Sequence, residues 1–438
     1  MIANTKAAYI HIPFCRRRCY YCDFPITVIG DRASEKFART QLMKNYVQAL
    51  CQEIRLTATL YPSSNLETVF FGGGTPSLLP TTELERILIT LEETFGLSKD
   101  AEISLEIDPG TFDFPQLQAY QNLGINRYSL GVQAFQDELL ASLGRTHRLK
   151  DIDRAIAQFE QLGITNFSLD LISGLPQQTV SQWEETLEKA IEVSPAHLSC
   201  YDLIIEPGTA FERQLEKGKL PLPPDETAAE MYRITQQRLT DAGYDHYEIS
   251  NYALAGYQCR HNRIYWQNLP FYGFGMGATS YLGGKRYARS RTRREYYAWL
   301  ESLTETPNDL TPTPPIDPID QLLETLMLGL RLKEGVNLSA IAQQFGAETV
   351  NQIIDTLQPY IKKQWVQVSK MKSNQLSCVL IPPTPLTKGG KAVITASKHF
   401  SISYQPNYEE WGQLKLSDPE GFLFSNSIIA QLFQDFSD

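Results

Sequence analysis

The stretch His11-Ile-Pro-Phe-Cys15-Arg-Arg-Arg-Cys19-Tyr-Tyr-Cys22 lies near the N-terminus and decides how the rest of this chain is interpreted. It spaces three cysteines as C-x3-C-x2-C on one short segment. Three thiolates held this close can ligate three irons of a [4Fe–4S] cube and leave the fourth iron without a protein ligand. An open iron can bind a substrate or a cofactor. The spacing therefore predicts a [4Fe–4S] cluster on Cys15, Cys19 and Cys22.

Two other uses of these cysteines fit the sequence less well. A disulfide framework is typical of small, cysteine-dense chains in oxidising compartments, whereas this chain has 7 cysteines in 438 residues. A zinc site usually takes four ligands, often from two C-x2-C pairs, and no second pair follows. The remaining cysteines are expected to be buried or incidental thiols. They are Cys51, Cys200, Cys259 and Cys378.

The composition and charge exclude several classes of protein. The net charge of −10 and the pI near 5.3 argue against a general nucleic-acid binder. Met1 to Ile12 does not resemble a signal peptide. No stretch approaches the ~18 apolar residues of a membrane span. We expect a cytoplasmic protein, because thiols stay reduced in the cytoplasm and a cluster survives there.

Short apolar runs alternate with amphipathic helical stretches over the first two thirds of the chain. Candidate strands cover Ala7–Ile12, Thr68–Phe71, Ile103–Ile107, Arg127–Gly131, Phe167–Ile172 and His197–Leu203. Candidate helices include Lys44–Leu60, Thr82–Phe95, Asp151–Leu162 and Val180–Val193. This alternation indicates parallel βαβ units. It predicts an α/β fold, a partial (β/α)6 barrel over residues 1–303, in which functional residues lie at the C-terminal ends of the strands.

The last third of the chain has a different pattern. Residues 304–318 are rich in Pro and Thr and are expected to form a linker. Residues 319–438 predict a small winged-helix-like domain, which we interpret as a structural cap and not as a DNA reader. The expected elements are helices at Asp320–Leu332, Leu338–Phe345, Thr349–Lys363 and Gly421–Phe433, a strand at Trp365–Val368, and order resuming at Trp411. Residues 381–408 read as a disordered, low-complexity insertion.

Glycines and polar residues gather where the predicted strands end. Gly72-Gly73-Gly74-Thr75-Pro76 follows the second strand, and its glycines let the backbone approach a ligand closely. Glu106 and Gln133 end the third and fourth strands, Arg145 follows, and Asp170 lies on the fifth strand. A carboxylate at a barrel mouth needs a partner, and an arginine pairs with carboxylates in a fork geometry. As a series, these residues indicate a ligand site.

These motifs resemble the radical S-adenosylmethionine (SAM) superfamily. Within it, they resemble the group that contains oxygen-independent coproporphyrinogen III dehydrogenase and its heme-chaperone relatives, over about residues 6–375 and 411–433. The resemblance implies that the methionine part of SAM binds the open iron, where the cluster can split SAM to a 5′-deoxyadenosyl radical. The implied SAM contacts are Tyr9, Tyr21, Gly73, Gly74, Thr75, Glu106, Gln133, Arg145, Asp170 and Ile204.

Two departures from the dehydrogenase pattern favour the chaperone branch. The dehydrogenase carries a fourth cysteine two residues after the third, and Phe24 occupies that position here. It also has about fifty residues before its cluster loop that help to bind a second SAM and the substrate, as the resemblance implies, whereas 14 residues precede Cys15 in this sequence. Both features argue against decarboxylation of coproporphyrinogen.

The run His261-Asn262-Arg263-Ile264-Tyr265 matches the H-N-x-x-Y pattern that the resemblance associates with heme binding in the chaperone branch. A neutral imidazole is a good axial ligand for heme iron, and a phenolate can be one. Aromatic residues in the region 257–294 suit a flat macrocycle. We predict heme binding through His261, Asn262 and Tyr265, with Cys259 as a rival ligand. A basic run follows, which fits either heme propionates or a solvated face: Lys285, Arg286, Arg289, Arg291, Arg293 and Arg294.

The sequence thus favours a heme chaperone that binds a [4Fe–4S] cluster, SAM and heme and passes heme to an acceptor apo-protein, with a respiratory acceptor among the candidates. Whether SAM is cleaved stays open. The expected partners include no nucleic acid. Transient membrane association, and a monomer or a homodimer, also stay open.

Two other functions are weighed against the chaperone. The first is oxygen-independent coproporphyrinogen III dehydrogenase, an enzyme in which the 5′-deoxyadenosyl radical abstracts a propionate hydrogen before CO2 leaves. The second is a heme-responsive DNA-binding regulator that uses the C-terminal domain. The helix Thr349–Lys363 has only Lys362 and Lys363 as basic residues, which is a poor recognition face for phosphates.

Overall fold

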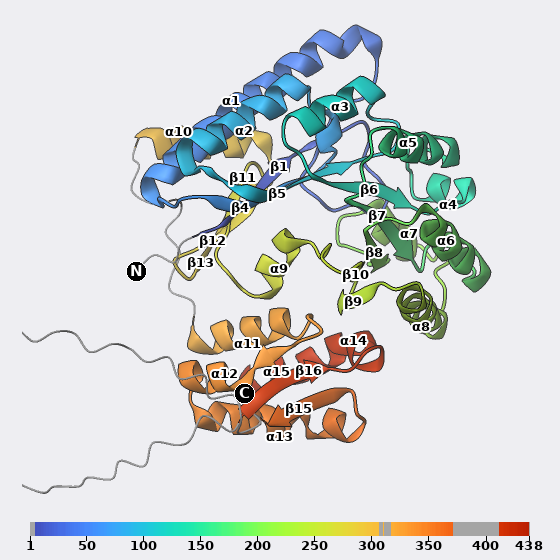
Figure 1. Ribbon diagram of the computed structural model, residues 1–438, viewed down its shortest axis with the longest axis vertical. Coiled ribbons are helices and arrows are strands. Elements are labelled where there is room, and N and C mark those ends of the chain that lie inside the picture. Colours follow the sequence, from blue (N-terminus) through green and yellow to red (C-terminus); the bar gives the residue numbers. More distant parts are fainter. Residues whose placement is uncertain (1–4, 306–309, 311–316, 371–410, 438) are drawn as a thin grey trace, which may run out of the picture.

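The computed structural model describes residues 5–305, 310, 317–370 and 411–437 (Figure 1). The predicted insertion at residues 381–408, most of the predicted linker and Cys378 lie outside the described residues.

Six parallel strands form the centre of the larger part of the molecule. They run in the order β1-β4-β5-β6-β7-β8, and each pairs in parallel with its neighbour. Their bounds are Ala7–Ile12, Leu66–Gly73, Leu97–Ile107, Arg127–Gln133, Phe167–Ser173 and His197–Asp202. The predicted α/β fold is therefore confirmed.

Three short strands that the sequence analysis did not predict extend this sheet at its edges. β11 (Tyr272–Phe274) pairs in parallel with β1, β10 (Asn251–Ala253) pairs antiparallel with β8, and β9 (Asp245–Glu248) follows β10. The described residues thus form a nine-stranded sheet. Runs of three or four residues are too short for a period-two pattern to stand out.

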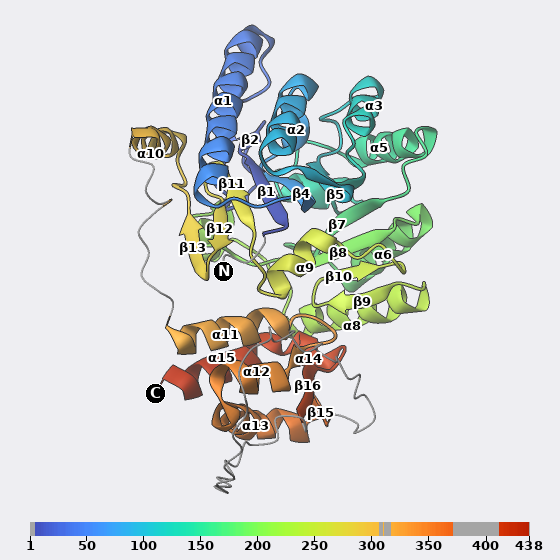
Figure 2. The ribbon, with the colours of Figure 1, turned by 60° about the vertical axis from the view of Figure 1, so that its left-hand side comes forward.

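Helices cover the outside of the sheet (Figures 1 and 2). They are α1 (Lys36–Leu60), α2 (Thr81–Phe95), α3 (Phe114–Asn122), α4 (Asp137–Ser142), α5 (Leu149–Gln161), α6 (Val180–Val193), α7 (Ala210–Leu215) and α8 (Asp225–Asp241). In α5, Ile152, Ala155 and Phe159 are buried at helical spacing. A capping box between Thr179 and Gln182 begins α6.

Smaller elements complete the larger part of the molecule. The cysteine-rich loop lies between β2 (Phe14–Cys15) and β3 (Thr27–Val28), which pair in parallel. One-turn helices cover Ala33–Glu35 and Pro76–Leu78. The region after β10 contains α9 (Arg260–Trp266), the hairpin of β12 (Thr279–Leu282) and β13 (Lys285–Ala288), and α10 (Arg293–Glu305).

The C-terminal part has its own apolar core, which contains Leu322, Leu338, Ile353, Leu414 and Ile428. Its helices are α11 (Pro318–Gly329), α12 (Leu338–Phe345), α13 (Ala347–Lys362), α14 (Glu420–Leu423) and α15 (Ser425–Ser437). Its antiparallel sheet has the order β14-β16-β15, formed by Val336–Asn337, Trp411–Leu416 and Val366–Lys370.

One helix prediction in this part was wrong. The single helix expected at Gly421–Phe433 is two helices, which are separated at Phe424. Phe424 leaves the helical conformation with φ −99° and ψ 16°, and its ring stacks on Trp365 with centroids 4.2 Å apart. This packing across the small domain is not visible in helical periodicity.

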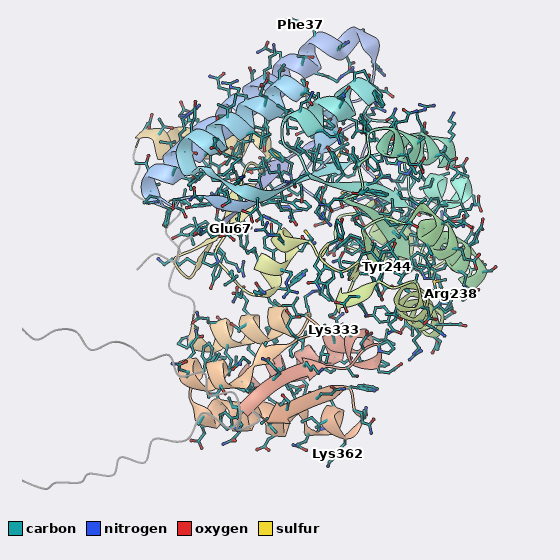
Figure 3. All side chains as sticks on the ribbon, in the orientation of Figure 1. Phe37, Glu67, Arg238, Tyr244, Lys333 and Lys362 are labelled. Carbon is teal, nitrogen blue, oxygen red and sulfur yellow. The ribbon has the colours of Figure 1, made fainter. Side chains whose placement is uncertain are left out.

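The two parts meet below α9, where α11 lies beside it (Figures 1 and 2). Lys333 stands at this junction (Figure 3) and its ammonium group lies 2.5 Å from Asp245. His246 Nδ1 lies 2.8 Å from an Asp418 carboxylate oxygen. None of the described helices has the length and apolar character that a bilayer crossing requires.

Candidate functional site

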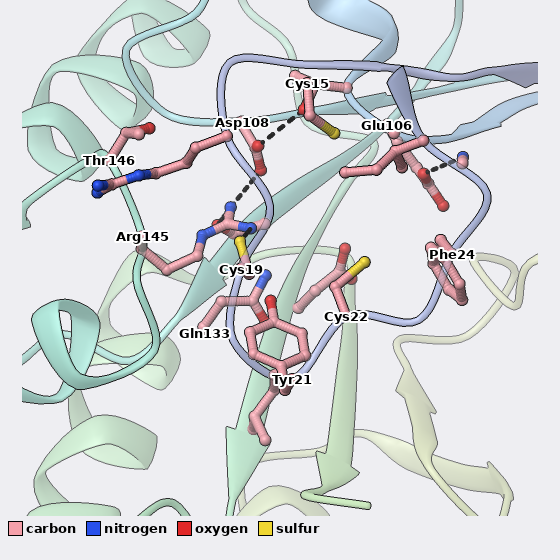
Figure 4. Close-up of a pocket in the computed structure, with 18 of the residues that line it drawn as sticks. Cys15, Cys19, Tyr21, Cys22, Phe24, Glu106, Asp108, Gln133, Arg145 and Thr146 are labelled. Carbon is pink, nitrogen blue, oxygen red and sulfur yellow. Dashed lines mark hydrogen bonds and ion pairs between the residues drawn. The ribbon is translucent and has the colours of Figure 1, made fainter. Parts of the chain in front are cut away.

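A cavity of about 390 Å³ opens at the C-terminal ends of the parallel strands (Figure 4). Twelve predicted residues line this single space, although they come from separate parts of the chain. They are Cys15, Cys19, Tyr21, Cys22, Gly73, Gly74, Thr75, Glu106, Gln133, Arg145, Asp170 and Ile204. The structure therefore brings together the predicted cluster ligands and all but one of the predicted SAM contacts.

Hydrogen bonds to backbone carbonyl groups hold the cysteine loop. Ile29 N donates to Cys15 O at 2.9 Å, and Cys22 N donates to Cys19 O at 3.3 Å. The Arg18 guanidinium donates to Cys22 O at 3.0 Å and so closes the loop on itself. Cys15, Cys19 and Cys22 are free thiols, and Figure 4 shows their side chains on the same cavity.

The three predicted cluster cysteines do not form a ready-made site for a single metal ion. No three His, Cys, Asp or Glu side chains in the described part of the chain converge as the ligands of one metal ion would. A cube of four irons holds its thiolates further apart than one ion does. Burial raises the pKa of Cys15 to about 12, with the Thr75 hydroxyl opposing, and burial also raises the pKa of Cys22. Loading iron therefore has to release these protons.

The glycine loop after β4 brings its backbone close to the cysteine loop. A Cβ atom on Gly74 would lie 2.8 Å from Phe14 O, which leaves no room for a larger residue. Gly73 N donates to Glu106 Oε2 at 2.9 Å. Gly73 has φ +111°, a conformation that L side chains rarely adopt. This loop could not follow the same path with other residues at these two positions.

Two carboxyl groups, Glu106 and Asp170, line the cavity. Burial raises the pKa of Glu106 to about 8, and the nearby charge of Asp170 adds to the rise, whereas the Gly73 N–H opposes it. Burial also raises the pKa of Asp170, although the Ser129 hydroxyl donates to both of its oxygens at 2.9 and 3.0 Å. A cationic or hydroxyl-bearing ligand would offset the cost of these charges.

Two predicted SAM contacts have unusual placements. Gln133 lines the cavity with φ +68°, a left-handed backbone that is uncommon for glutamine. Tyr9 does not line the cavity. Its hydroxyl lies 3.0 Å from His11 Nδ1, and its ring lies behind Gly72.

Asp108 is a cavity residue that the sequence reading missed. Arg145 Nη2 forms an ion pair with Asp108, and Arg145 Nη1 donates to Cys19 Sγ at 3.7 Å (Figure 4). Arg145 was expected to face a ligand carboxylate; here a protein carboxylate already holds it. A signal was available, since Asp108 lies two residues after Glu106 on the same strand exit, and alternate strand residues face the same side.

The H-N-x-x-Y motif lies away from this cavity. His261 is 0% exposed. Its Nδ1 lies 2.8 Å from Thr68 Oγ1 and its Nε2 lies 2.8 Å from the Tyr265 hydroxyl, while its backbone N donates to Glu102. Thr68 is the third residue of β4 and Glu102 the sixth of eleven in β5, so the motif packs nearer the N-terminal ends of these strands than Gly73 and Glu106, which line the cavity.

The other two heme candidates have different surroundings. Cys259 is buried, and its thiol donates to Glu102 Oε1 at 3.7 Å. Asn262 is partly exposed on α9. The C-terminal part holds α9 from outside, because Glu334 forms an ion pair with Arg263 and the Arg331 guanidinium lies 4.3 Å from the centre of the Trp266 ring.

The basic run after the motif is partly engaged within the fold and partly exposed. Arg289 is buried and its Nε donates to Glu53 at 2.8 Å. Arg286 pairs with Glu324 at 2.6 Å, and Arg291 approaches Asp23 at 3.4 Å. Arg286 and Arg289 therefore pair with carboxylates within the fold, whereas Arg291 and Arg294 are exposed.

Comparison with known proteins identifies the family to which the chain belongs. Residues 9–190 match the model of the Radical SAM superfamily, and residues 316–371 match the model of the HemN C-terminal domain. The chain is 48% identical, over 98% of its length and 96% of the relative's, to the heme chaperone HemW of Synechocystis. This chain belongs to the HemW family of the radical SAM superfamily. The HemW of Bacillus subtilis is 34% identical over 86% of this chain and 95% of its own length.

Membership of the HemW family confirms the predicted radical SAM barrel and its cofactors, a [4Fe–4S] cluster and SAM. The solved structure of HemN, the coproporphyrinogen III oxidase of Escherichia coli, superposes with a TM-score of 0.73. It covers 98% of this chain and 90% of its own at 23% identity. At that identity the likeness shows a shared fold and not a shared reaction.

Proposed function

We propose that this protein is a heme chaperone, which binds heme and passes it to an acceptor apo-protein in the cytoplasm. The observation that supports this most is that relatives matching 98% and 86% of its length are named heme chaperones.

We assign SAM to the cavity at the strand ends. When bound to the cluster, SAM supplies a carbon–sulfur bond that one electron can split. Glu106 would accept from the amino group or ribose of SAM, while the backbone of Gly73 and Gly74 allows its close approach. Ile204, 66% exposed at the cavity edge, would cover the adenine. Tyr21, Thr75, Gln133, Arg145 and Asp170 complete the proposed contacts, and Tyr9 would need to turn towards the cavity.

We assign heme to the region of His261, Asn262 and Tyr265. Neutral imidazole is the form that ligates iron, and burial lowers the pKa of His261 to about 3, so that it stays neutral at physiological pH. Both ring nitrogens already have partners, however, so heme binding requires α9 to move away from the sheet. The proposal therefore includes an opened form of this region.

Phe24 supports the chaperone over the dehydrogenase. It lines the cavity beside Cys22 and is 55% exposed, at the position where the dehydrogenase pattern has a fourth cysteine. A phenyl ring offers neither a thiolate nor an acidic proton, so a reaction that depends on that cysteine cannot proceed in the same way.

A heme titration combined with a turnover assay tests this function. Anaerobically reconstituted protein is titrated with hemin while the Soret band is recorded. A parallel sample receives coproporphyrinogen III, SAM and dithionite. The chaperone proposal expects saturable heme binding at one heme per chain and no protoporphyrinogen. Protoporphyrinogen formation without stable heme binding would favour the dehydrogenase.

A further inference from the structure

Asp108 accepts hydrogen bonds from two side chains that each also contact a cluster cysteine. The Thr75 hydroxyl lies 3.2 Å from Asp108 Oδ2 and 3.6 Å from Cys15 Sγ. The Arg145 guanidinium forms an ion pair with Asp108 through Nη2 and donates to Cys19 Sγ at 3.7 Å through Nη1. One carboxylate is therefore linked, through one intermediate group each, to two of the three predicted iron ligands (Figure 4).

The backbone around Asp108 fixes this carboxylate in place. Asp108 N donates to Ser77 Oγ at 3.3 Å. Asp108 O accepts from Thr111 N at 3.1 Å and from the Thr111 hydroxyl at 2.7 Å, so the backbone of Asp108 is fixed on both sides. On the other side, a Cβ atom on Gly131 would lie 2.7 Å from Asp108 Oδ1, and Gly131 O accepts from Arg145 at 3.0 Å. Asp108 and Arg145 are thus held in one arrangement.

This arrangement makes Asp108 a competitor of the cysteine sulfurs. A threonine hydroxyl has a single proton, so it can donate to Asp108 or to Cys15 but not fully to both. The guanidinium of Arg145 can reach both acceptors, and its positive charge is compensated by Asp108. Hydrogen bonds to the sulfurs and nearby charge are two of the factors that set the reduction potential of an iron–sulfur cluster.

We infer that Asp108 is a positioning residue that lowers the reduction potential of the cluster by drawing the Thr75 hydroxyl and the Arg145 charge away from the sulfurs of Cys15 and Cys19. The reduced cluster carries one more negative charge than the oxidised cluster. A carboxylate that is close by, and that shares the hydrogen-bond donors of the thiolates, therefore disfavours the reduced form. This inference concerns the cluster and is independent of heme binding.

The isosteric substitution Asp108→Asn tests the inference. It removes the charge, and the asparagine NH2 can donate to the Thr75 oxygen, which leaves the hydroxyl proton for Cys15. In an EPR-monitored redox titration of the reconstituted full chain without SAM, the ratio of reduced to oxidised cluster at a fixed potential should rise about tenfold, which corresponds to about 59 mV for one electron.

Asp113→Asn is the matched control. Asp113 lies in the same loop after β5, is exposed, and caps α3 by accepting from Gln116 N at 2.9 Å, which an asparagine oxygen can also do. This substitution removes the same charge without touching Thr75 or Arg145, and the ratio should stay within about twofold of the wild type, because exposed charges are well screened. Equal ratios in Asp108→Asn and Asp113→Asn proteins with full iron content would overturn the inference.

Thr75→Val keeps the inference testable if Asp108→Asn does not hold its cluster. Valine has the shape of threonine without the hydroxyl, so Cys15 loses the share of the hydroxyl proton that Asp108 leaves to it, while Asp108 stays charged. The ratio of reduced to oxidised cluster should then fall, whereas Thr75→Ser, which keeps the hydroxyl, should restore it. A Thr75→Val cluster with the wild-type ratio and EPR spectrum would contradict the inference.

Discussion

The Nε2 atom of His261 lies 2.8 Å from the hydroxyl oxygen of Tyr265, and their rings meet edge to face with centroids 5.0 Å apart. The other ring nitrogen, Nδ1, lies 2.8 Å from the Thr68 hydroxyl oxygen. The imidazole is therefore a fully bonded interior group in this conformation. Heme iron can bind Nε2 only after the tyrosine hydroxyl has left it, so heme binding at this histidine requires the motif to open.

Tyr265→Phe should strengthen heme binding if His261 is the iron ligand. The substitution frees Nε2, and a typical hydrogen bond contributes about 1 kcal/mol, which is roughly fivefold in affinity. A Soret titration measures the change. Thr68→Val is the matched control, since it removes the partner of Nδ1 and leaves Nε2 occupied.

A His261→Ala protein that kept the wild-type Soret spectrum and affinity would contradict the histidine assignment. Loss of binding in Tyr265→Phe would instead assign the iron to the phenolate.

Weakening the contacts that hold α9 from outside should speed heme uptake. Glu334→Gln removes the ion pair with Arg263, and an exposed pair contributes up to about 1 kcal/mol, so we expect a few-fold faster association in stopped-flow measurements. Higher salt should have the same effect on the wild type. Glu188→Gln, which breaks a pair with Arg238 on the far helices α6 and α8, should leave the rate unchanged. Equal rates in Glu334→Gln and the wild type would argue against this route.

Glu106 should make the stability of the metal-free protein pH-dependent. Its pKa is raised to about 8 in the folded state, whereas an unfolded glutamate has a pKa of about 4.3. Stability is therefore lost as the pH rises from about 4 to about 8, since the folded state holds the proton more tightly. Glu106→Gln cannot ionise and keeps an oxygen for the Gly73 N–H.

Unfolding measured across this pH range should show the wild type losing several kcal/mol relative to Glu106→Gln, at about 1.4 kcal/mol per pKa unit. The exposed Glu93→Gln should follow the wild type. Parallel profiles for the wild type and Glu106→Gln would contradict the raised pKa.

The ion pair between Arg289 and Glu53 should matter far more than the surface pairs. Both side chains are almost fully buried, and Glu53 also accepts from Gly275 N at 2.8 Å and from the Tyr296 hydroxyl at 2.6 Å. Arg289→Leu leaves a buried carboxylate without its cation, which typically costs about 3–5 kcal/mol. Glu420→Gln breaks the exposed pair with Arg233 and should cost about 0–1 kcal/mol. Similar denaturant midpoints for the two variants in chemical unfolding would contradict this prediction.

The sequence predicted the parts of the molecule that depend on local order. Cys15, Cys19 and Cys22 fall close together because the chain between them is short, and the strand-end residues Glu106 and Asp170 meet because parallel strands end at one edge of a sheet. Strand β1 has the bounds that its apolar run predicted.

The rest depends on contacts between distant segments, which no local pattern contains. Burial of His261 follows from the packing of α9 against Thr68, 193 residues earlier. The pairing of Arg145 with Asp108 depends on where two loops meet, and the break at Phe424 depends on Trp365. Charge patterns likewise could not show that Arg289 faces a buried Glu53 and not solvent.

Transfer of heme is the most direct test of the chaperone account. Protein loaded with heme and freed of excess is mixed with an apo-hemoprotein acceptor, and the appearance of the holo-acceptor spectrum is timed. The same loaded protein is mixed with a passive scavenger, apomyoglobin, which reports spontaneous release. The account predicts that the acceptor fills faster than the scavenger and that the rate rises with acceptor concentration. Equal, concentration-independent rates would mean that heme merely dissociates, and would contradict a chaperone function.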